Sequence, residues 1–146
     1  MSSSDIFGIV GSALNAQNAR MAAIASNLAN ADSITPPGGT PYRAQEVVFE
    51  AAPVAGDANS DFGSDGTTDM GVSVAGTLQS NAAPQQKYDP GSPYADANGY
   101  VTGSNVSQAD EMVNLIDSSN SYSASVAVLQ QASRIDQQML SSFQVS

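Results

Sequence analysis

Residues 5–30 read DIFGIVGSALNAQNARMAAIASNLAN, and this stretch decides the fold. Its seam residues recur alternately three and four positions apart, which is the spacing of one face of an α-helix. The seam consists of Phe7, Val10, Leu14, Gln17, Met21, Ile24 and Leu28, in which Gln17 is the one polar residue. Asp5 favours a helix start, and the turn sequence TPPGGTP at 35–41 favours an end near Asn30. We therefore expect a long amphipathic helix over 5–30.

Two asparagines, Asn27 and Asn30, lie near the end of this helix. Asparagine is a poor helix former because its short amide competes for backbone hydrogen bonds. Asn30 is followed by Asp32 and the Pro-Gly turn, and asparagine tolerates the left-handed conformation that closes many helices, so we expect it to end the helix. Asn27 lies beside Leu28 on the seam, where we expect its amide to tie the helix to the backbone of a neighbour in an assembly.

The same three-four alternation returns in residues 105–146, which contain neither Gly nor Pro. Ser107, followed by Asp110 and Glu111, is typical of a helix start. The predicted seam is Met112, Leu115, Ser119, Tyr122, Val126, Leu129, Ser133, Asp136, Leu140 and Phe143. A second apolar stripe runs beside it through Val128, Ala132, Ile135 and Met139. We expect a second long helix that contacts more than one neighbour.

The region between the helices holds all seven prolines and reads as β-rich. Residues 42–50 and 71–78 are predicted strands, the second with Val72, Val74 and Leu78 pointing inward. Asn98-Gly99 is a candidate tight turn. Residues 51–69 are acidic and Gly-rich, which predicts a flexible loop.

These elements predict a mainly α fold with a small β-rich middle domain. The expected domains are an N-terminal coiled-coil helix (1–31), the middle domain (32–104) and a C-terminal coiled-coil helix (105–146). Two helices of this length exceed what so small a middle domain can cover. They should pair as an antiparallel coiled coil and leave apolar surface for other subunits.

Composition excludes several classes of function. Four Lys and Arg against fourteen Asp and Glu give a net charge of −10, which argues against nucleic acid or an anionic membrane as partner. The chain has no Cys, His or Trp, so thiolate and imidazole metal sites and a Ser-His-Asp triad are excluded. The N-terminus lacks the features of a secretory signal, and no apolar run is long enough to insert into a membrane. We expect no cofactor and a protein partner.

Three weaker patterns allow alternative interpretations. Oxygen-bearing side chains of the loop could bind calcium: they are Asp57, Asn59, Asp61, Asp65 and Asp69, but Phe62 stands where an EF-hand needs Gly. For catalysis the candidates are Lys87 and the pair Asp89 and Asp96, although carboxylates beside a Pro-Gly turn are commonly turn residues. Four tyrosines could form a binding platform, yet aromatics at strand positions usually pack within a sheet. In each case we favour the structural interpretation: a solvated acidic loop, turn carboxylates and tyrosines packed in a small sheet. We expect no enzymatic activity.

Several stretches resemble the bacterial flagellar axial proteins of the rod and hook class. The N-terminal helix ends in ASNLANADS (25–33), which is similar to the signature of that family. The resemblance continues through PYRAQEVVFEA (41–51), GVSVAGTL (71–78), YDPGSPYADANGYV (88–101) and NVSQADEMVNLIDSSNSYSASVAVL (105–129). Together these stretches cover nearly the whole chain and resemble a proximal-rod member.

The resemblance implies a non-enzymatic subunit of the basal-body rod. Such subunits leave the cell unfolded through the flagellar type III export apparatus and pack into a hollow, torque-transmitting shaft across the periplasm. The implied partners are further copies of the chain, the rod proteins FlgB, FlgF and FlgG, and FliE. The expected assembly interface is Phe7, Val10, Leu14, Met21, Ile24, Asn27, Leu28, Asn30, Met112, Leu115, Tyr122, Val126, Leu129 and Leu140. The alternative is a secreted calcium-dependent adhesin or binding module that uses the acidic loop.

Overall fold

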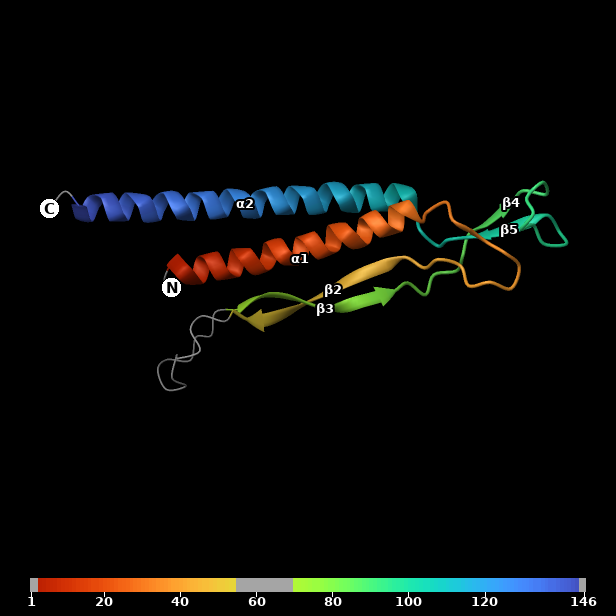
Figure 1. Ribbon diagram of the computed structural model, residues 1–146, viewed down its shortest axis with the longest axis horizontal. Coiled ribbons are helices and arrows are strands. Elements are labelled where there is room, and N and C mark those ends of the chain that lie inside the picture. Colours follow the sequence, from red (N-terminus) through yellow and green to blue (C-terminus); the bar gives the residue numbers. More distant parts are fainter. Residues whose placement is uncertain (1–2, 55–69, 145–146) are drawn as a thin grey trace. The chain divides into compact units, whose positions relative to one another are not determined.

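The computed structural model describes residues 3–54 and 70–144 and contains two long helices with short strands between them (Figure 1). The helices are α1 (Ser3–Ala29) and α2 (Gln108–Gln144). The strands are β1 (Ile34–Thr35), β2 (Gln45–Pro53), β3 (Met70–Gln79), β4 (Gln86–Tyr88) and β5 (Tyr100–Gly103). The prediction of two long terminal helices around a small β region is confirmed. The predicted acidic loop at 51–69 lies largely outside the described residues.

Helix α1 ends where the sequence predicted, at the residue before Asn30. The Asn30 side chain donates from Nδ2 to the carbonyl of Ser26 at 2.8 Å, and the Ser33 hydroxyl donates to the carbonyl of Asn30 at 2.7 Å. These side-chain bonds reinforce the backbone bonds that the amides of Asn30 (3.2 Å) and Ser33 (3.1 Å) donate to the same two carbonyls. Asn30 is therefore part of the helix stop.

Helix α2 begins just after Ser107. The amide of Asp110 donates to the Ser107 hydroxyl at 3.4 Å, and the amide of Glu111 donates to the Ser107 carbonyl at 3.0 Å. Ser107 thus caps the helix as predicted, and two acidic residues occupy the positive end of the helix dipole.

The strands form two small sheets. Antiparallel strands β1, β5 and β4 form the first in that order, with Thr35 opposite Thr102 and Lys87 opposite Val101. Strands β2 and β3 form a separate two-stranded sheet, here called the ribbon. The sequence predicted both strands of the ribbon but none of β1, β4 and β5.

The predicted turn at Asn98-Gly99 is confirmed. One carboxylate oxygen of Asp96 accepts the amides of Asn98 (2.8 Å) and Tyr100 (2.9 Å), and Gly99 has a φ of 82°. That φ lies in the region that glycine adopts without strain. Tyr88 and Tyr100 pack edge to face across strands β4 and β5 at 5.3 Å between ring centroids. Tyr88 and Tyr100 belong to this sheet, and Asp96 is a turn residue.

Strand β3 faces the opposite way from the prediction. Val72 and Val74 were expected to point inward, but they are 37% and 39% exposed, and Leu78 is 63% exposed. Gly71 is buried instead and lies against α1. A Cβ at this position would be only 2.5 Å from the Ser12 hydroxyl. The strand presents its small residues to the helix so that the two backbones can approach closely.

The chain divides into two compact units, the first built from three segments and the second from two. The first comprises Met1–Ala19, Phe49–Ala75 and Ser118–Ser146, and the second comprises Arg20–Val48 and Gly76–Asp117. The buried apolar residues among those described are Ala16, Ile24, Ala44, Val101 and Val106. These cores are small, and among the described residues seventeen large apolar side chains stay exposed.

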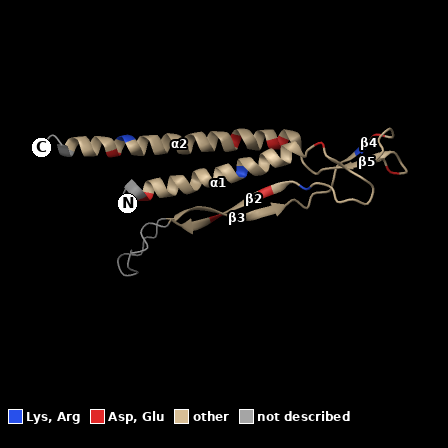
Figure 2. Cartoon of the chain, in the orientation of Figure 1, with Lys and Arg blue, Asp and Glu red and all other residues tan. Residues whose placement is uncertain are grey.

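Charge is sparse over the whole chain, and Figure 2 shows very few basic residues among scattered acidic ones. Within the described residues, neither helix contains a segment long and apolar enough to cross a membrane.

Candidate assembly interface

Asn27 is the best-bonded side chain of the predicted interface, and it is 1% exposed. Its Nδ2 donates to the carbonyl of Gln45 at 2.9 Å, and its Oδ1 accepts the amide of the same residue at 2.8 Å. The Tyr42 hydroxyl also donates to Oδ1, at 3.1 Å. The side-chain amide thus replaces a neighbouring strand at the first residue of β2.

These bonds change the role expected for Asn27. We expected its amide to reach the backbone of a neighbouring subunit, but the structure ties it to the backbone of its own chain. The physical reason is that β2 starts beside the last turns of α1, where Gln45 would otherwise have an unpaired N–H and C=O. Asn27 joins the helix to the β region within one subunit.

A second asparagine, Asn105, holds the adjacent residue. Its Oδ1 accepts the amide of Ala44 at 2.7 Å, and its Nδ2 donates to the carbonyls of Ser80 (3.3 Å) and Ala82 (3.0 Å). We call Asn27 and Asn105 the asparagine clamp, because together they bond Gln45, the first residue of β2, and Ala44, the residue before it. Asn27 could be singled out from the sequence as a poor helix former inside a helix, whereas no sequence pattern pointed to Asn105.

The two helices contact each other in the first unit through a polar pair. The Ser118 hydroxyl of α2, which is 0% exposed, donates to Oε1 of Gln17 of α1 at 2.9 Å. Gln17 is the polar residue that interrupts the predicted seam. Its amide finds a hydroxyl partner there, so the interruption does not leave a buried polar group unsatisfied.

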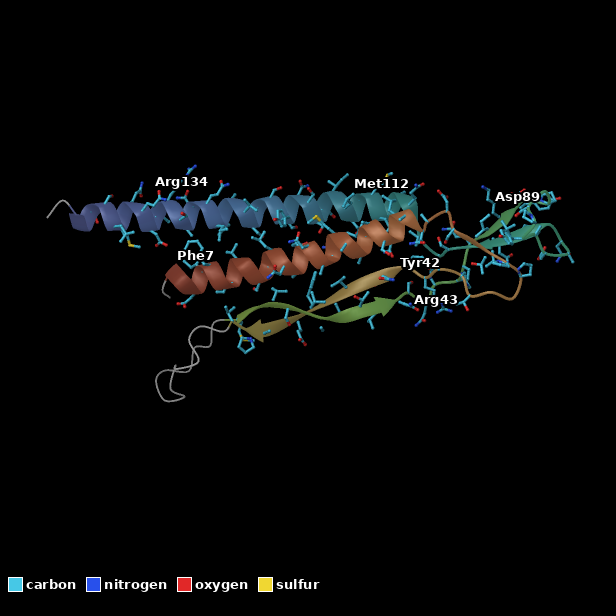
Figure 3. All side chains as sticks on the ribbon, viewed as in Figure 1. Phe7, Tyr42, Arg43, Asp89, Met112 and Arg134 are labelled. Carbon is cyan, nitrogen blue, oxygen red and sulfur yellow. The ribbon has the colours of Figure 1, made fainter. Side chains whose placement is uncertain are left out.

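A second contact between the helices forms an open groove lined by Phe7 of α1 and by Leu129, Gln130, Ser133 and Arg134 of α2. Phe7 and Arg134 carry labels in Figure 3. From the Gln17–Ser118 contact to this groove, the residue numbers fall along α1, from 17 to 7, and rise along α2, from 118 to 129.

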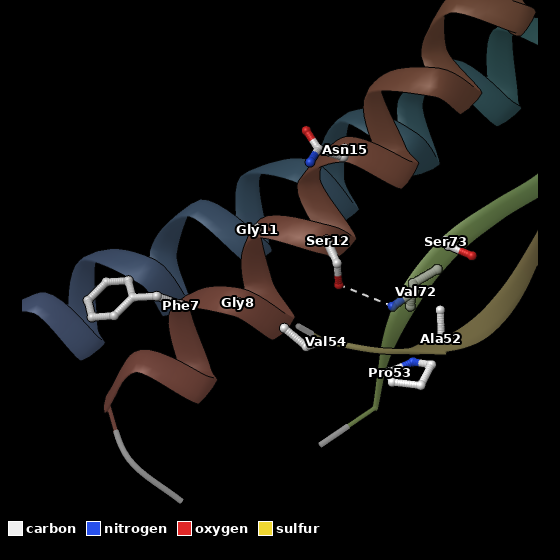
Figure 4. Close-up of a pocket in the computed structure, with 10 residues that line it drawn as sticks. All are labelled: Phe7, Gly8, Gly11, Ser12, Asn15, Ala52, Pro53, Val54, Val72 and Ser73. Carbon is white, nitrogen blue, oxygen red and sulfur yellow. Dashed lines mark hydrogen bonds between the residues drawn. The ribbon is translucent and has the colours of Figure 1, made fainter. Parts of the chain in front are cut away.

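The ribbon attaches to the other side of α1 in the same unit (Figure 4). The amide of Val72 donates to the Ser12 hydroxyl at 3.1 Å, and that hydroxyl donates to the carbonyl of Ile9 at 2.7 Å. Val54 lies against Gly8, where a Cβ would be only 2.5 Å from its Cγ1. Glycine at this position allows the ribbon to touch the helix.

The ribbon and α1 also enclose an uncharged hollow of about 420 Å3. Its lining, drawn in Figure 4, consists of Phe7, Gly8, Gly11, Ser12, Asn15, Ala52, Pro53, Val54, Val72 and Ser73. This lining contains no acid, base or nucleophile pair, so it offers packing surface and no catalytic arrangement.

The predicted interface residues fall into three exposure classes. Ile24 and Asn27 are buried, whereas Met112 and Leu140 are 50% and 66% exposed. The half-buried members are Phe7, Val10, Leu14, Met21, Leu28, Asn30, Leu115, Tyr122, Val126 and Leu129. The covered face of α2 includes Glu111, Leu115 and Ser118, while the neighbouring Met112 and Ser119 of the predicted seam are exposed.

The alternative sites find no support. Lys87 is exposed on β4, and Asp96 is committed to its turn. Within 3–54 and 70–144, no three carboxylates gather into a group that could hold a metal ion. The candidate calcium ligands Asp57, Asn59, Asp61, Asp65 and Asp69 lie outside the described residues.

Comparisons with known proteins identify the family. A family model described as "Flagella basal body rod protein" matches residues 9–36, and one described as "Flagellar basal body rod FlgEFG protein C-terminal" matches residues 97–142. The flagellar basal-body rod protein FlgC of Salmonella typhimurium is 48% identical over 125 residues, which cover 86% of each chain. The chain belongs to the FlgC family of flagellar basal-body rod proteins.

Further members of the FlgC family are similarly close. The proteins of that name from Escherichia coli O157:H7 and Yersinia enterocolitica are 48% and 46% identical, over 86% and 88% of this chain. The prediction of a structural flagellar rod protein is confirmed, and no relative supports a calcium-dependent adhesin. The family matches fall on α1 with its Asn27 and on the segment from Ala97 through most of α2, which includes Asn105.

Proposed function

We propose that the chain is a rod subunit that works by packing alone, without catalysis or a cofactor. The observation that carries the proposal is the balance of apolar surface. Among the described residues, five buried apolar residues form the cores, while seventeen large apolar side chains remain exposed. Exposed apolar surface on this scale marks an interaction site, because a lone chain gains nothing from leaving it in water.

The terminal helices pair as an antiparallel coiled coil in this proposal. The Gln17–Ser118 bond and the groove between Phe7 and Leu129 support it, since residue numbers change in opposite directions along the two helices. The helices form the inner layer around a narrow channel, and the β-rich middle faces outward. Residues 1–31, 32–104 and 105–146 are the proposed domains.

The proposed partners are further copies of the chain and other flagellar rod components, specifically FlgB, FlgF, FlgG and FliE. The chain reaches them through the flagellar type III export apparatus. Assembly takes place in the basal body, where the rod spans the periplasm and transmits torque. Family membership supports the basal-body location, and the low content of charge supports close packing of many helices.

Leu140→Asp tests the packing role, because Leu140 is 66% exposed and belongs to the predicted interface. An exposed substitution changes stability by roughly 0.5 kcal/mol or less, so the purified variant should keep the circular dichroism spectrum and unfolding midpoint of the wild type. An aspartate buried in an assembly costs several kcal/mol, so cells with this variant should build no rod and should not swim.

The matched control is Gln137→Asp, which adds the same charge one turn earlier at an exposed position outside the predicted interface. Cells with the control should swim. Normal swimming and normal basal bodies with Leu140→Asp, seen by electron microscopy, would show that this surface plays no part in assembly.

A further inference from the structure

Asn98-Gly99 is the one place in the sequence where glycine follows asparagine. The turn requires this glycine, because Gly99 has a φ of 82° and a Cβ there would lie 2.9 Å from Cε2 of Tyr88. Glycine also has no side chain to shield its backbone nitrogen from the side-chain amide of the asparagine before it. The turn therefore places a chemically reactive pair at the surface, where Asn98 is exposed.

The reaction open to this pair is deamidation. The nitrogen of Gly99 loses its proton and bonds to Cγ of Asn98, the bond from Cγ to the side-chain nitrogen breaks, and ammonia leaves. The cyclic imide that forms then takes up water and opens to a carboxylic acid. Opening at one carbonyl gives aspartate, whereas opening at the other gives isoaspartate, in which the main chain runs through the side chain and is one atom longer.

The peptide groups around the reactive nitrogen are hydrogen-bonded in the folded turn. The Gly99 amide donates to the carbonyl of Asp96 at 3.0 Å, and the carbonyl of Gly99 accepts the amide of Asp89 at 2.9 Å. The amides of Asn98 and Tyr100, on either side, donate to one carboxylate oxygen of Asp96 at 2.8 Å and 2.9 Å. Gly99 must give up its proton and its bond to Asp96 before the imide ring can close.

The Asp96 carboxylate opposes the reaction for a second reason. The attacking nitrogen becomes negative when it loses its proton, and a carboxylate bonded to both neighbouring amides disfavours a second negative charge beside it. Hydrogen bonds to a charged acceptor are also stronger than those to a neutral one, so they stabilise the closed turn. One side chain thus holds the turn closed and disfavours the nucleophile.

We propose that Asn98 is a deamidation site that reacts when the turn opens, and that Asp96 suppresses the reaction in the folded protein. In the unfolded chain these bonds are absent, and Asn98 reacts before the other asparagines, since each of those is followed by a residue with a side chain. Isoaspartate would lengthen the main chain between the paired strands β4 and β5 and place a second acid beside Asp96. Deamidation therefore marks chains that have stayed unfolded and prevents them from forming this turn.

Peptide mapping by mass spectrometry tests the proposal, because conversion of an amide to an acid changes the mass of the peptide that contains it. The wild type is incubated at mildly alkaline pH, both in buffer and in guanidinium chloride that unfolds it. Asp96→Ala and the matched control Asp89→Ala are incubated in buffer, and circular dichroism checks that both are folded. Asp89 is an exposed acid that bonds to Gly99 through its backbone amide, which alanine retains.

Conversion at Asn98 should be slow in the folded wild type and in Asp89→Ala, and fastest in guanidinium chloride. Asp96→Ala should convert roughly tenfold faster than its control, because the loss of two hydrogen bonds to a charged acceptor raises the population of the open turn by about that factor. Equal rates in the two variants would overturn the role of Asp96. Equal rates for the wild type in buffer and in denaturant, or earlier conversion of another asparagine in denaturant, would overturn the site.

Asp96→Asn replaces Asp96→Ala if the alanine variant is unfolded in buffer. Its side-chain oxygen can still accept both amides, while the negative charge is lost, so it should also convert faster than Asp89→Ala. A rate equal to that of the control would again overturn the role of Asp96. None of these outcomes bears on the proposed rod function, which the swimming of cells with Leu140→Asp tests.

Discussion

Asn27 shows how one side chain can set the geometry of a subunit. Its amide has one acceptor and one donor group, and the structure uses both on Gln45 while Tyr42 adds a third bond. A leucine has the same number of side-chain heavy atoms but would leave the N–H and C=O of Gln45 unpaired. A buried polar group without a partner costs about 1–3 kcal/mol, so the poor helix propensity of asparagine is a small loss by comparison.

Asn27→Asp tests this bonding with almost no change in shape. The carboxylate can still accept from Gln45 and Tyr42 but cannot donate to the Gln45 carbonyl, and it places a charge at a site that is 1% exposed. We expect a loss of about 1–3 kcal/mol in the free energy of unfolding at neutral pH, measured by urea denaturation. Burial favours the protonated acid, which can donate, so the folded state binds the proton more tightly than the unfolded state does.

The stability of Asn27→Asp relative to the wild type should therefore rise as the pH falls through the raised pKa of the new acid. The control is Asn18→Asp, an exposed position on the same helix, whose stability should stay close to that of the wild type. A variant at Asn27 that is as stable as the control at neutral pH would refute the clamp.

At the scale of elements, the attachment of the ribbon to α1 depends on missing side chains. A Cβ at Gly8 would lie 2.5 Å from Cγ1 of Val54, whereas a Cβ at Gly11, three residues on, would meet nothing within 4 Å. The two glycines are therefore a matched pair in one helix. One makes room for the ribbon, and the other only lowers the helix propensity.

Gly11→Ala should stabilise the protein by about 0.5–1 kcal/mol, because alanine removes the conformational freedom of glycine in the unfolded chain. Gly8→Ala also reduces the conformational freedom of the unfolded chain, but its Cβ would clash with Val54, whose β-branched side chain has few alternative rotamers. We expect Gly8→Ala to be less stable than Gly11→Ala and to loosen the ribbon. Hydrogen exchange at the Val72 amide, which bonds to Ser12, measures this loosening and should be faster in Gly8→Ala alone.

The sequence predicted the existence and extent of the long elements better than the faces they present. Three-four spacing and end signals located both helices to within a few residues, because these signals are local. The covered face of α2 was harder to predict, since it includes Ser118, a small polar residue that fits against Gln17, while apolar Met112 is exposed. The orientation of β3 depends on Gly71 meeting Ser12 fifty-nine residues earlier in the chain, which no local pattern contains.

For the whole molecule, the balance of charge sets the conditions under which copies can associate. Fourteen acidic and four basic residues give a sequence pI of about 4.1, so free subunits repel each other near neutral pH. The attraction between apolar surfaces acts only at contact, whereas the electrostatic repulsion between two subunits acts over about one Debye length. Association should therefore depend on ionic strength through screening of the repulsion.

We expect self-association of the purified chain to strengthen as salt rises from roughly 10 mM to roughly 300 mM, where the Debye length falls from about 30 Å to below 10 Å. Sedimentation velocity at neutral pH measures this change. Asp117→Asn removes one exposed acid from α2, and this variant should associate more readily than the wild type at low salt and respond less to added salt. If association weakened with salt instead, attraction between opposite charges would have to hold the copies together, and the apolar surfaces would lose their assigned role.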